Sequence, residues 1–350
     1  MEDIKIRYGW LDCLRAIAVL LVIFQHYFYD RFFINDSPSP FVEYFRIINF
    51  GKVGVVIFFF VSGFIIPRSL FSESHSPIKT FAISRFFRLY PAYWLSVIFA
   101  ASLSSQLGTK NFFINLTMLQ QFVGSPNLIG VYWTLQIELI FYFICAVLFY
   151  FQQLQQPQTA RKMFFSLLFI ALMFAIARGF SGHAIPVALP LCLAVMFLGT
   201  IFYWCSEKNQ LSFPKFLIYT VFLTIFLIPI SFFAYRKDTG FGECWYGYIM
   251  SYTIGVVMTI ALSTRYKIQS SHFMFIGRIS YSIYLFHSIF KISFFQSAWL
   301  NALSSLVVTA LFSTLCYYLI EKPGQKLGAH LKKYLRTPKV RDMASHYQGN

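Results

Sequence analysis

Ten long apolar stretches run along the chain and constrain its fold more than any other feature. A helix needs about 17 to 25 apolar residues to cross a bilayer. We expect such helices at approximately 10–29, 51–67, 88–105, 129–151, 163–180, 184–204, 213–234, 245–263, 279–297 and 300–320. Only 12% of the 350 residues are charged, whereas soluble proteins carry about 25%. The sequence therefore predicts an all-α polytopic membrane protein, a single bundle of about ten transmembrane helices.

The basic residues orient this predicted bundle. Ten spans place both termini on one side of the membrane, and twenty Lys and Arg residues fall on that side against seven on the other. Because cytoplasmic loops collect Lys and Arg, we expect both termini to be cytoplasmic. The net charge of +16 then reflects topology and requires no nucleic-acid partner. We divide the chain into a cytoplasmic N-terminus (1–9), a ten-helix membrane domain (10–320) and a basic cytoplasmic tail (321–350).

The first stretch, LDCLRAIAVLLVIFQHYF, holds an ionisable residue near each end. On a regular α-helix Arg15 and His26 share one face and lie roughly 16 Å apart along the axis. The predicted orientation puts Arg15 near the cytoplasmic mouth and His26 in the outer half. Ionisable groups inside a spanning helix usually serve a function. The plain alternative is an arginine that reaches the headgroups and a histidine that hydrogen-bonds inside the bundle.

More arginines follow on the predicted cytoplasmic side of the next two spans. Arg68 ends the second span, while Arg85 and Arg88 are three residues apart and share a helical face. Guanidinium groups suit phosphates well. These arginines are therefore candidates to hold a phosphorylated substrate, and ordinary positive-inside charge or lipid headgroup contact explains them equally well.

Two further stretches place polar groups inside predicted spans. Glu138, in YWTLQIE, is the only acid of the fourth span, and a carboxylate at that depth needs a partner. His26 is a suitable partner, since a carboxylate would orient the imidazole as a general base; a helix–helix contact or a proton relay are the alternatives. His287, in SYSIYLFH, either lines the same cavity or is a core histidine. Ser62-Gly63, within GVVIFFFVSGF, allows close approach of a neighbouring helix or of a ligand, and helix packing is the favoured interpretation.

Taken in order, these stretches resemble the membrane-bound acyltransferase-3 family of bacterial sugar O-acyltransferases. The resemblance rests on six successive motifs, LDCLRAIAVLLVIFQH, GVVIFFFVSGF, RFFRLYPAYW, NLTMLQ, GVYWTLQIELIFY and GRISYSIYLFH. The chain departs from the family pattern at Val56, where an acid is often found, and at Cys13, which replaces a glycine. It looks like the stand-alone form, without the fused extracytoplasmic esterase-like domain.

The resemblance implies an O-acyltransferase of the bacterial inner membrane, with acetyl as the expected group. The implied donor is acetyl-CoA or another acyl-CoA on the cytoplasmic side, used as a co-substrate, with no permanently bound cofactor and no metal. The implied acceptor is a hydroxyl of a cell-envelope polysaccharide, a lipopolysaccharide or a lipid-linked sugar precursor. His26 would be the base or a transient acyl carrier, and Glu138 would orient it. The expected donor-binding residues are Arg15, Arg68, Arg85 and Arg88.

A different class of function is compatible with the same residues. In a proton-coupled or lipid-linked-glycan transporter, His26, Glu138, His287 and Lys291 would form an intramembrane proton relay. Such transporters commonly contain inverted repeats and paired broken helices, and we find no such repeat in the sequence.

Overall fold

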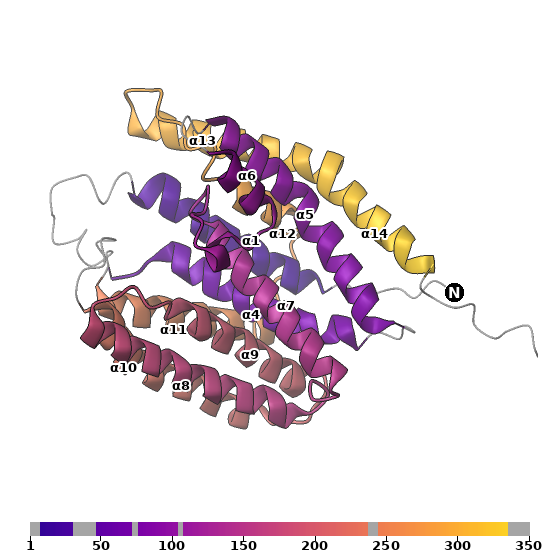
Figure 1. Cartoon of the computed structure of the whole chain (residues 1–350), viewed down its shortest axis with the longest axis vertical. Coiled ribbons are helices and arrows are strands. Elements are labelled where there is room, and N and C mark those ends of the chain that lie inside the picture. The colour runs from indigo at the N-terminus through magenta and orange to yellow at the C-terminus, as the bar shows by residue number, and fades with distance from the viewer. Residues whose placement is uncertain (1–7, 31–46, 72–75, 104–107, 237–243, 335–350) are drawn as a thin grey trace, which may run out of the picture.

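The computed structural model of the chain describes residues 8–30, 47–71, 76–103, 108–236 and 244–334, which form helices and no strand (Figure 1). Residues 1–7 of the predicted N-terminal segment and residues 335–350 of the predicted tail lie outside the described residues. In the described part of the chain, nine helices are long and apolar enough to cross a membrane. The all-α polytopic architecture is thereby confirmed, whereas the cytoplasmic placement of the termini stays a prediction.

Most of the helices follow the predicted spans. The first span consists of α1 (Gly9–Ile23) and a π-helical turn, η1 (Phe24–Tyr29). The next helices are α4 (Phe50–Leu70), α5 (Pro77–Leu103), α7 (Tyr132–Tyr150), α8 (Pro157–Ser181), α9 (Ala188–Ser206), α10 (Phe213–Tyr235) and α11 (Trp245–Thr264). The last are α12 (Ser271–Phe286), α13 (Ala298–Cys316), a π-helical turn η3 (Tyr317–Glu321) and α14 (Lys322–Tyr334). A short helix, α6 (Thr109–Leu116), and a 3-10 turn, η2 (Gln120–Val123), connect α5 to α7.

Three of the predicted boundaries are wrong. Helix α5 begins at Pro77 rather than near residue 88, because its charged first half lowers the hydropathy without interrupting the helix. The ninth span is displaced from 279–297 to α12, which has 16 residues and is shorter than the roughly 20 that usually cross a bilayer. The last helix continues past residue 320 into the predicted tail, where α14 packs against α5.

The centre of the bundle is α9, which is buried on every side. All of its residues from Pro190 to Cys205 are buried, and α4 packs closely against it. A Cβ added at Gly63 would overlap the carbonyl of Met196, and one at Gly199 would overlap the carbonyl of Phe60. Small residues permit such close approach between membrane helices. The packing interpretation of Ser62-Gly63 is therefore confirmed.

Helix α1 lies between α4 and α12, and two glycines fix it there. A Cβ at Gly54 would overlap the carbonyl of Ala18, and one at Gly277 would overlap the carbonyl of Asp12. In Figure 1, α8 and α10 lie along one edge of the bundle and α5 and α14 along the opposite edge, with α1 and α4 between them. Large apolar side chains are exposed along α8, α10 and α13, as expected where helices face lipid. The ionisable residues of α1 are thus held in the interior.

Candidate active site

A cavity that is partly open to the surroundings lies among α1, α4, α5, α7 and α12. Most of its wall is apolar, supplied by valine, isoleucine, leucine and aromatic side chains. Its charged lining residues are Arg15, Arg85, Arg88 and Glu138. A concave, mainly apolar site with a few convergent polar groups is the usual form of a small-molecule site. The fold therefore brings together four of the six residues that the sequence singled out.

The cavity has an excess of positive charge. Three arginines line it against one carboxylate, and Glu321, which is only 2% exposed, adds a second carboxylate nearby in η3. Arg85 is held in place because its Nη2 donates to Ser69 Oγ at 3.0 Å. Its guanidinium also lies 5.4 Å from the centroid of the Tyr142 ring. Like charges gathered in a low-dielectric pocket attract an anionic ligand, so the cavity suits a phosphorylated molecule.

Glu138 belongs to this arginine-lined cavity. Its Oε1 accepts hydrogen bonds from the Tyr142 hydroxyl and from Ser62 Oγ, the latter at 3.2 Å. The sequence predicts His26 as the partner of Glu138, whereas the structure shows Tyr142 and Ser62 in that role. Depth along a helix is readable from sequence, but the direction in which a side chain leaves a uniformly apolar helix is not. Ser62, beside the packing residue Gly63, takes part in the site through this contact.

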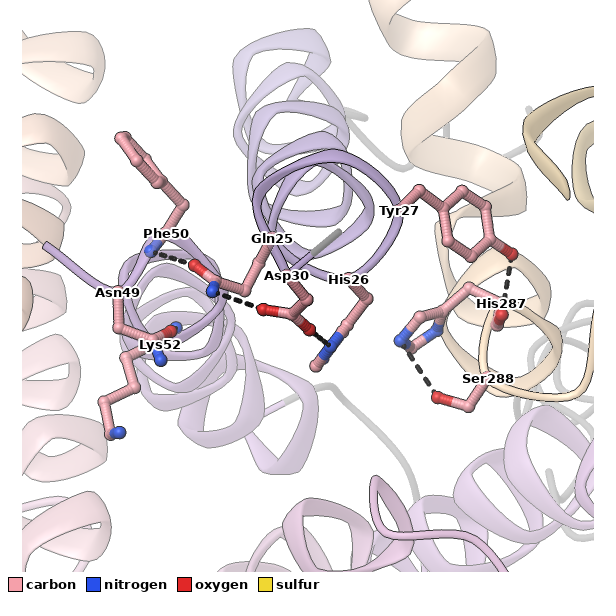
Figure 2. Close-up of polar contacts among 9 residues, drawn as sticks. All are labelled: Gln25, His26, Tyr27, Asp30, Asn49, Phe50, Lys52, His287 and Ser288. Atoms are coloured by element: carbon pink, nitrogen blue, oxygen red, sulfur yellow. Dashed lines mark hydrogen bonds and ion pairs between the residues drawn. The ribbon is translucent and has the colours of Figure 1, made fainter. Parts of the chain in front are cut away.

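His26 lies in the π-helical turn η1 and pairs with Asp30 (Figure 2). The Nδ1 atom of His26 is 3.0 Å from Asp30 Oδ2. Gln25 Nε2 donates to Asp30 Oδ1 at 2.8 Å, and Gln25 Oε1 accepts from the backbone N–H of Phe50 at 2.9 Å. Because an ionised carboxylate only accepts hydrogen bonds, Nδ1 carries the proton and Nε2 is left as the basic nitrogen. The site thus contains an Asp–His pair.

The ionisation of Asp30 supports this assignment of protons. Burial raises the pKa of the Asp30 carboxyl, but hydrogen bonds from His26 and Gln25 outweigh it and hold the pKa below its ordinary value. Asp30 is therefore ionised at neutral pH. The sequence analysis missed Asp30, although a signal was present: it follows His26 by four residues, the spacing at which two side chains share a helical face.

A second histidine lies directly beside this pair. His287, the residue after α12, is fully buried, and its ring centroid is 5.3 Å from that of His26 with 26° between the planes. The His287 ring is 5.7 Å from that of Tyr284, which lines the arginine cavity. The hydroxyl of Tyr284 is 2.8 Å from Thr134 Oγ1. The contacts thus run from the cavity through Tyr284 and His287 to His26, and His287 is a site residue as well as a core residue.

Arg15 lines the arginine cavity and His26 does not, and a π-helical turn begins between them. The spacing prediction assumed regular α geometry, whereas the helix widens from Phe24 onward. Single π turns within α-helices frequently occur at functional sites. Arg15 lines the cavity, and His26 lies beyond Tyr284 and His287.

Arg68 is placed apart from the other arginines. It lies at the end of the bundle where α1 begins, with Nη1 3.8 Å from Glu207 Oε2 and its guanidinium 4.5 Å from the centroid of the Tyr8 ring. The Tyr8 hydroxyl donates to the same Glu207 oxygen at 2.6 Å. This cluster ties the start of α1 to the ends of α4 and α9, and Arg68 is not among the residues that line the cavity.

The fold and site together define a polytopic membrane protein with a cationic cavity, in which the lining residue Tyr284 contacts His287 beside His26. The model of the family described as "Acyltransferase domain" matches residues 8–321. The chain therefore belongs to this acyltransferase family, and the resemblance predicted from the six motifs is confirmed.

Curated relatives of this chain occur in Staphylococcus aureus. Proteins of strains COL, MSSA476 and N315, each named "Putative O-acetyltransferase", are 26% identical to it over 371 aligned positions. The alignments cover 93% of this chain and 58% of each relative, so the chain spans a little over half the length of these proteins. No solved structure matches the chain.

Proposed function

We propose that this protein is an integral-membrane O-acyltransferase of the bacterial inner membrane, with acetyl as the transferred group. The donor is cytoplasmic acetyl-CoA or another acyl-CoA. The acceptor is a hydroxyl of a cell-envelope polysaccharide, a lipopolysaccharide or a lipid-linked sugar precursor. The observation that carries the proposal is the meeting of Arg15, Arg85 and Arg88 in one cavity whose inner wall, at Tyr284, adjoins the histidine pair.

The arginine cavity is our proposed donor site. Guanidinium groups bind phosphate oxygens in bidentate fashion, and coenzyme A carries several phosphates at one end of a long, flexible arm. The Arg15–His26 separation of roughly 16 Å along the helix axis is comparable to the reach of that arm. Glu138 limits repulsion among the arginines and is itself held by Ser62 and Tyr142. We assign Arg68, at first predicted to bind the donor, to the cluster with Glu207 and Tyr8.

The Asp30–His26 pair is our proposed catalytic base. The His26 side chain is 38% exposed, which lets a bulky glycan hydroxyl approach its Nε2. His26 takes the proton of this hydroxyl while the oxygen bonds to the acyl carbon. The thioester C–S bond breaks, and coenzyme A leaves as the thiol with that proton. Asp30 stabilises the imidazolium that forms. A positioned base of this kind accelerates a reaction by roughly 10²- to 10⁴-fold.

The test is a comparison of envelope glycans. A deletion strain is complemented with the wild-type chain, with His26→Ala or with His183→Ala, and the glycans are analysed by mass spectrometry. His183 is the matched control because it lies exposed between α8 and α9, away from the cavity, and its ring contacts the backbone carbonyl of Ser181. We expect the acyl mass to return with the wild type and with His183→Ala, and to stay absent with His26→Ala. Full acylation by a well-expressed His26→Ala variant would refute the proposal.

A second measurement separates this function from transport. The purified chain is placed in liposomes with acetyl-CoA and a labelled lipid-linked sugar. The release of free coenzyme A thiol and the movement of the labelled lipid across the bilayer are both measured. An acyltransferase releases the thiol and moves no solute. Movement of solute without any thiol release would favour a transporter instead.

A further inference from the structure

A serine next to the second histidine completes an arrangement that the proposed mechanism has not used. Ser288 Oγ is 3.2 Å from Nε2 of His287 (Figure 2). The Nδ1 atom of His287 is 2.7 Å from the carbonyl oxygen of Tyr284. A carbonyl oxygen can only accept, so Nδ1 carries the proton and Nε2 accepts the hydrogen bond of the serine hydroxyl. A hydroxyl, a base within hydrogen-bond reach and a group that orients the base form the arrangement of an activated nucleophile.

The two histidines face different surroundings. His26 is partly exposed and pairs with Asp30, whereas His287 is fully buried and contacts Tyr284, a residue of the arginine cavity. Figure 2 shows the two rings facing each other, with Asp30 on one side of His26 and His287 on the other. The Asp30–His26 pair is therefore open to an acceptor, whereas the His287–Ser288 pair adjoins the proposed donor site.

A purely structural role does not account for all of these contacts. Histidine can cap the end of a helix by donating to a free carbonyl, and the Nδ1 contact with Tyr284 does this for α12. Capping requires neither the stacking of His287 on His26 nor a hydroxyl on Nε2. Ser288 itself is only partly buried.

We propose that Ser288 carries the acyl group transiently, with His287 as its base, so that transfer takes place in two steps. The inference rests on the acyltransferase function proposed above. In the first step Ser288 Oγ bonds to the thioester carbon and its proton passes to His287 Nε2. The C–S bond breaks, and the coenzyme A thiolate leaves with that proton.

In the second step the Asp30–His26 pair acts on the acceptor. His26 Nε2 takes the proton of the acceptor hydroxyl, whose oxygen bonds to the acyl carbon of the serine ester. The bond from that carbon to Ser288 Oγ breaks, and the serine oxygen regains a proton from His26. A covalent intermediate divides one difficult transfer into two easier ones. It also lets donor and acceptor approach from different directions at different times.

The test uses the purified full chain in vesicles of phosphatidylethanolamine and phosphatidylglycerol, with radiolabelled acetyl-CoA as the probe. His26→Gln should accumulate label, because the first step proceeds and the second lacks its base. Peptide mass spectrometry should then locate one acetyl ester on Ser288. Ser288→Ala should prevent labelling and reduce thiol release by roughly 10²- to 10⁴-fold. Ser288→Cys should keep a nucleophile and become labelled as a thioester.

Ser304→Ala is the matched control, because this serine lies near the start of α13 and its hydroxyl donates only to the Asn301 carbonyl; it should behave as the wild type. Wild-type thiol release by Ser288→Ala would overturn the inference and leave the proposed function standing. Label on the imidazole of His26 in the wild type would also overturn it. Absence of any thiol release by the wild-type chain would instead reject the acyltransferase proposal itself.

Discussion

Asp30→Asn should change which nitrogen of His26 carries the proton. The Phe50 N–H fixes the amide orientation of Gln25, and Gln25 Nε2 then requires an acceptor at residue 30. An asparagine that turns its oxygen toward Gln25 turns its NH₂ group toward His26 Nδ1. The proton must then move to Nε2, and the basic nitrogen is lost.

The structure also sets the size of this effect. The productive tautomer survives in Asp30→Asn only if the side-chain amides of both Asn and Gln25 flip, which leaves the Phe50 N–H facing a donor. An unsatisfied buried N–H costs about 1 to 3 kcal/mol, and about 1.4 kcal/mol corresponds to a factor of ten in rate. We therefore expect acyl transfer to fall by roughly 5- to 150-fold, while the protein still folds and inserts into the membrane.

A second substitution should reverse the loss. In Gln25→Glu combined with Asp30→Asn, one oxygen of Glu accepts from Phe50 N–H and the other accepts from the Asn NH₂ group. The Asn oxygen then faces His26 Nδ1, as Asp30 does now. Thiol release from acetyl-CoA in vesicles would show the double variant at least about tenfold faster than Asp30→Asn alone. Equal rates for the two variants would refute the reasoning about the tautomer.

Three further predictions concern packing, donor binding and acid stability. Gly277→Ala should lower the free energy of unfolding by about 1 to 3 kcal/mol through overpacking, which thermal unfolding in detergent would measure. Gly130→Ala is the control, because a Cβ added at Gly130 would meet nothing within 4 Å. Arg85→Ala should raise the KM for acetyl-CoA by roughly 10- to 150-fold, while Arg68→Ala should leave it within about threefold; similar KM changes would contradict the separation of the two sites. Because folding lowers the pKa of Asp30, its carboxylate stabilises the fold above the ordinary pKa of about 3.9 and ceases to do so as the pH falls through the folded value. The Tm difference between the wild type and Asp30→Asn should accordingly shrink in acid. A Tm difference that stays constant with pH would contradict a stabilising role for the Asp30 carboxylate.

Much of the fold is readable from the sequence because a bilayer leaves few alternatives. A spanning segment must satisfy its backbone hydrogen bonds internally, so each apolar stretch of sufficient length becomes a helix. The number and order of these stretches along the chain therefore predict an all-α bundle. The helix boundaries were less well predicted where polar residues continue a helix, as at the start of α5 and in α14. They were also less well predicted where a helix ends although the following residues are apolar, as after α12. The six motifs in their order along the chain also sufficed to identify the family.

The contacts within the site required the tertiary structure. Membrane helices such as α4 are apolar on all sides, so hydropathy gives the depth of a residue and little about the direction in which it points. For this reason Glu138 could be placed in the right span but was expected beside His26 instead of in the arginine cavity. The π-helical turn that begins at Phe24 and contains His26 was likewise not readable from the sequence. Only the folded bundle brings His287, which follows α12 and contacts Ser288, against the ring of His26.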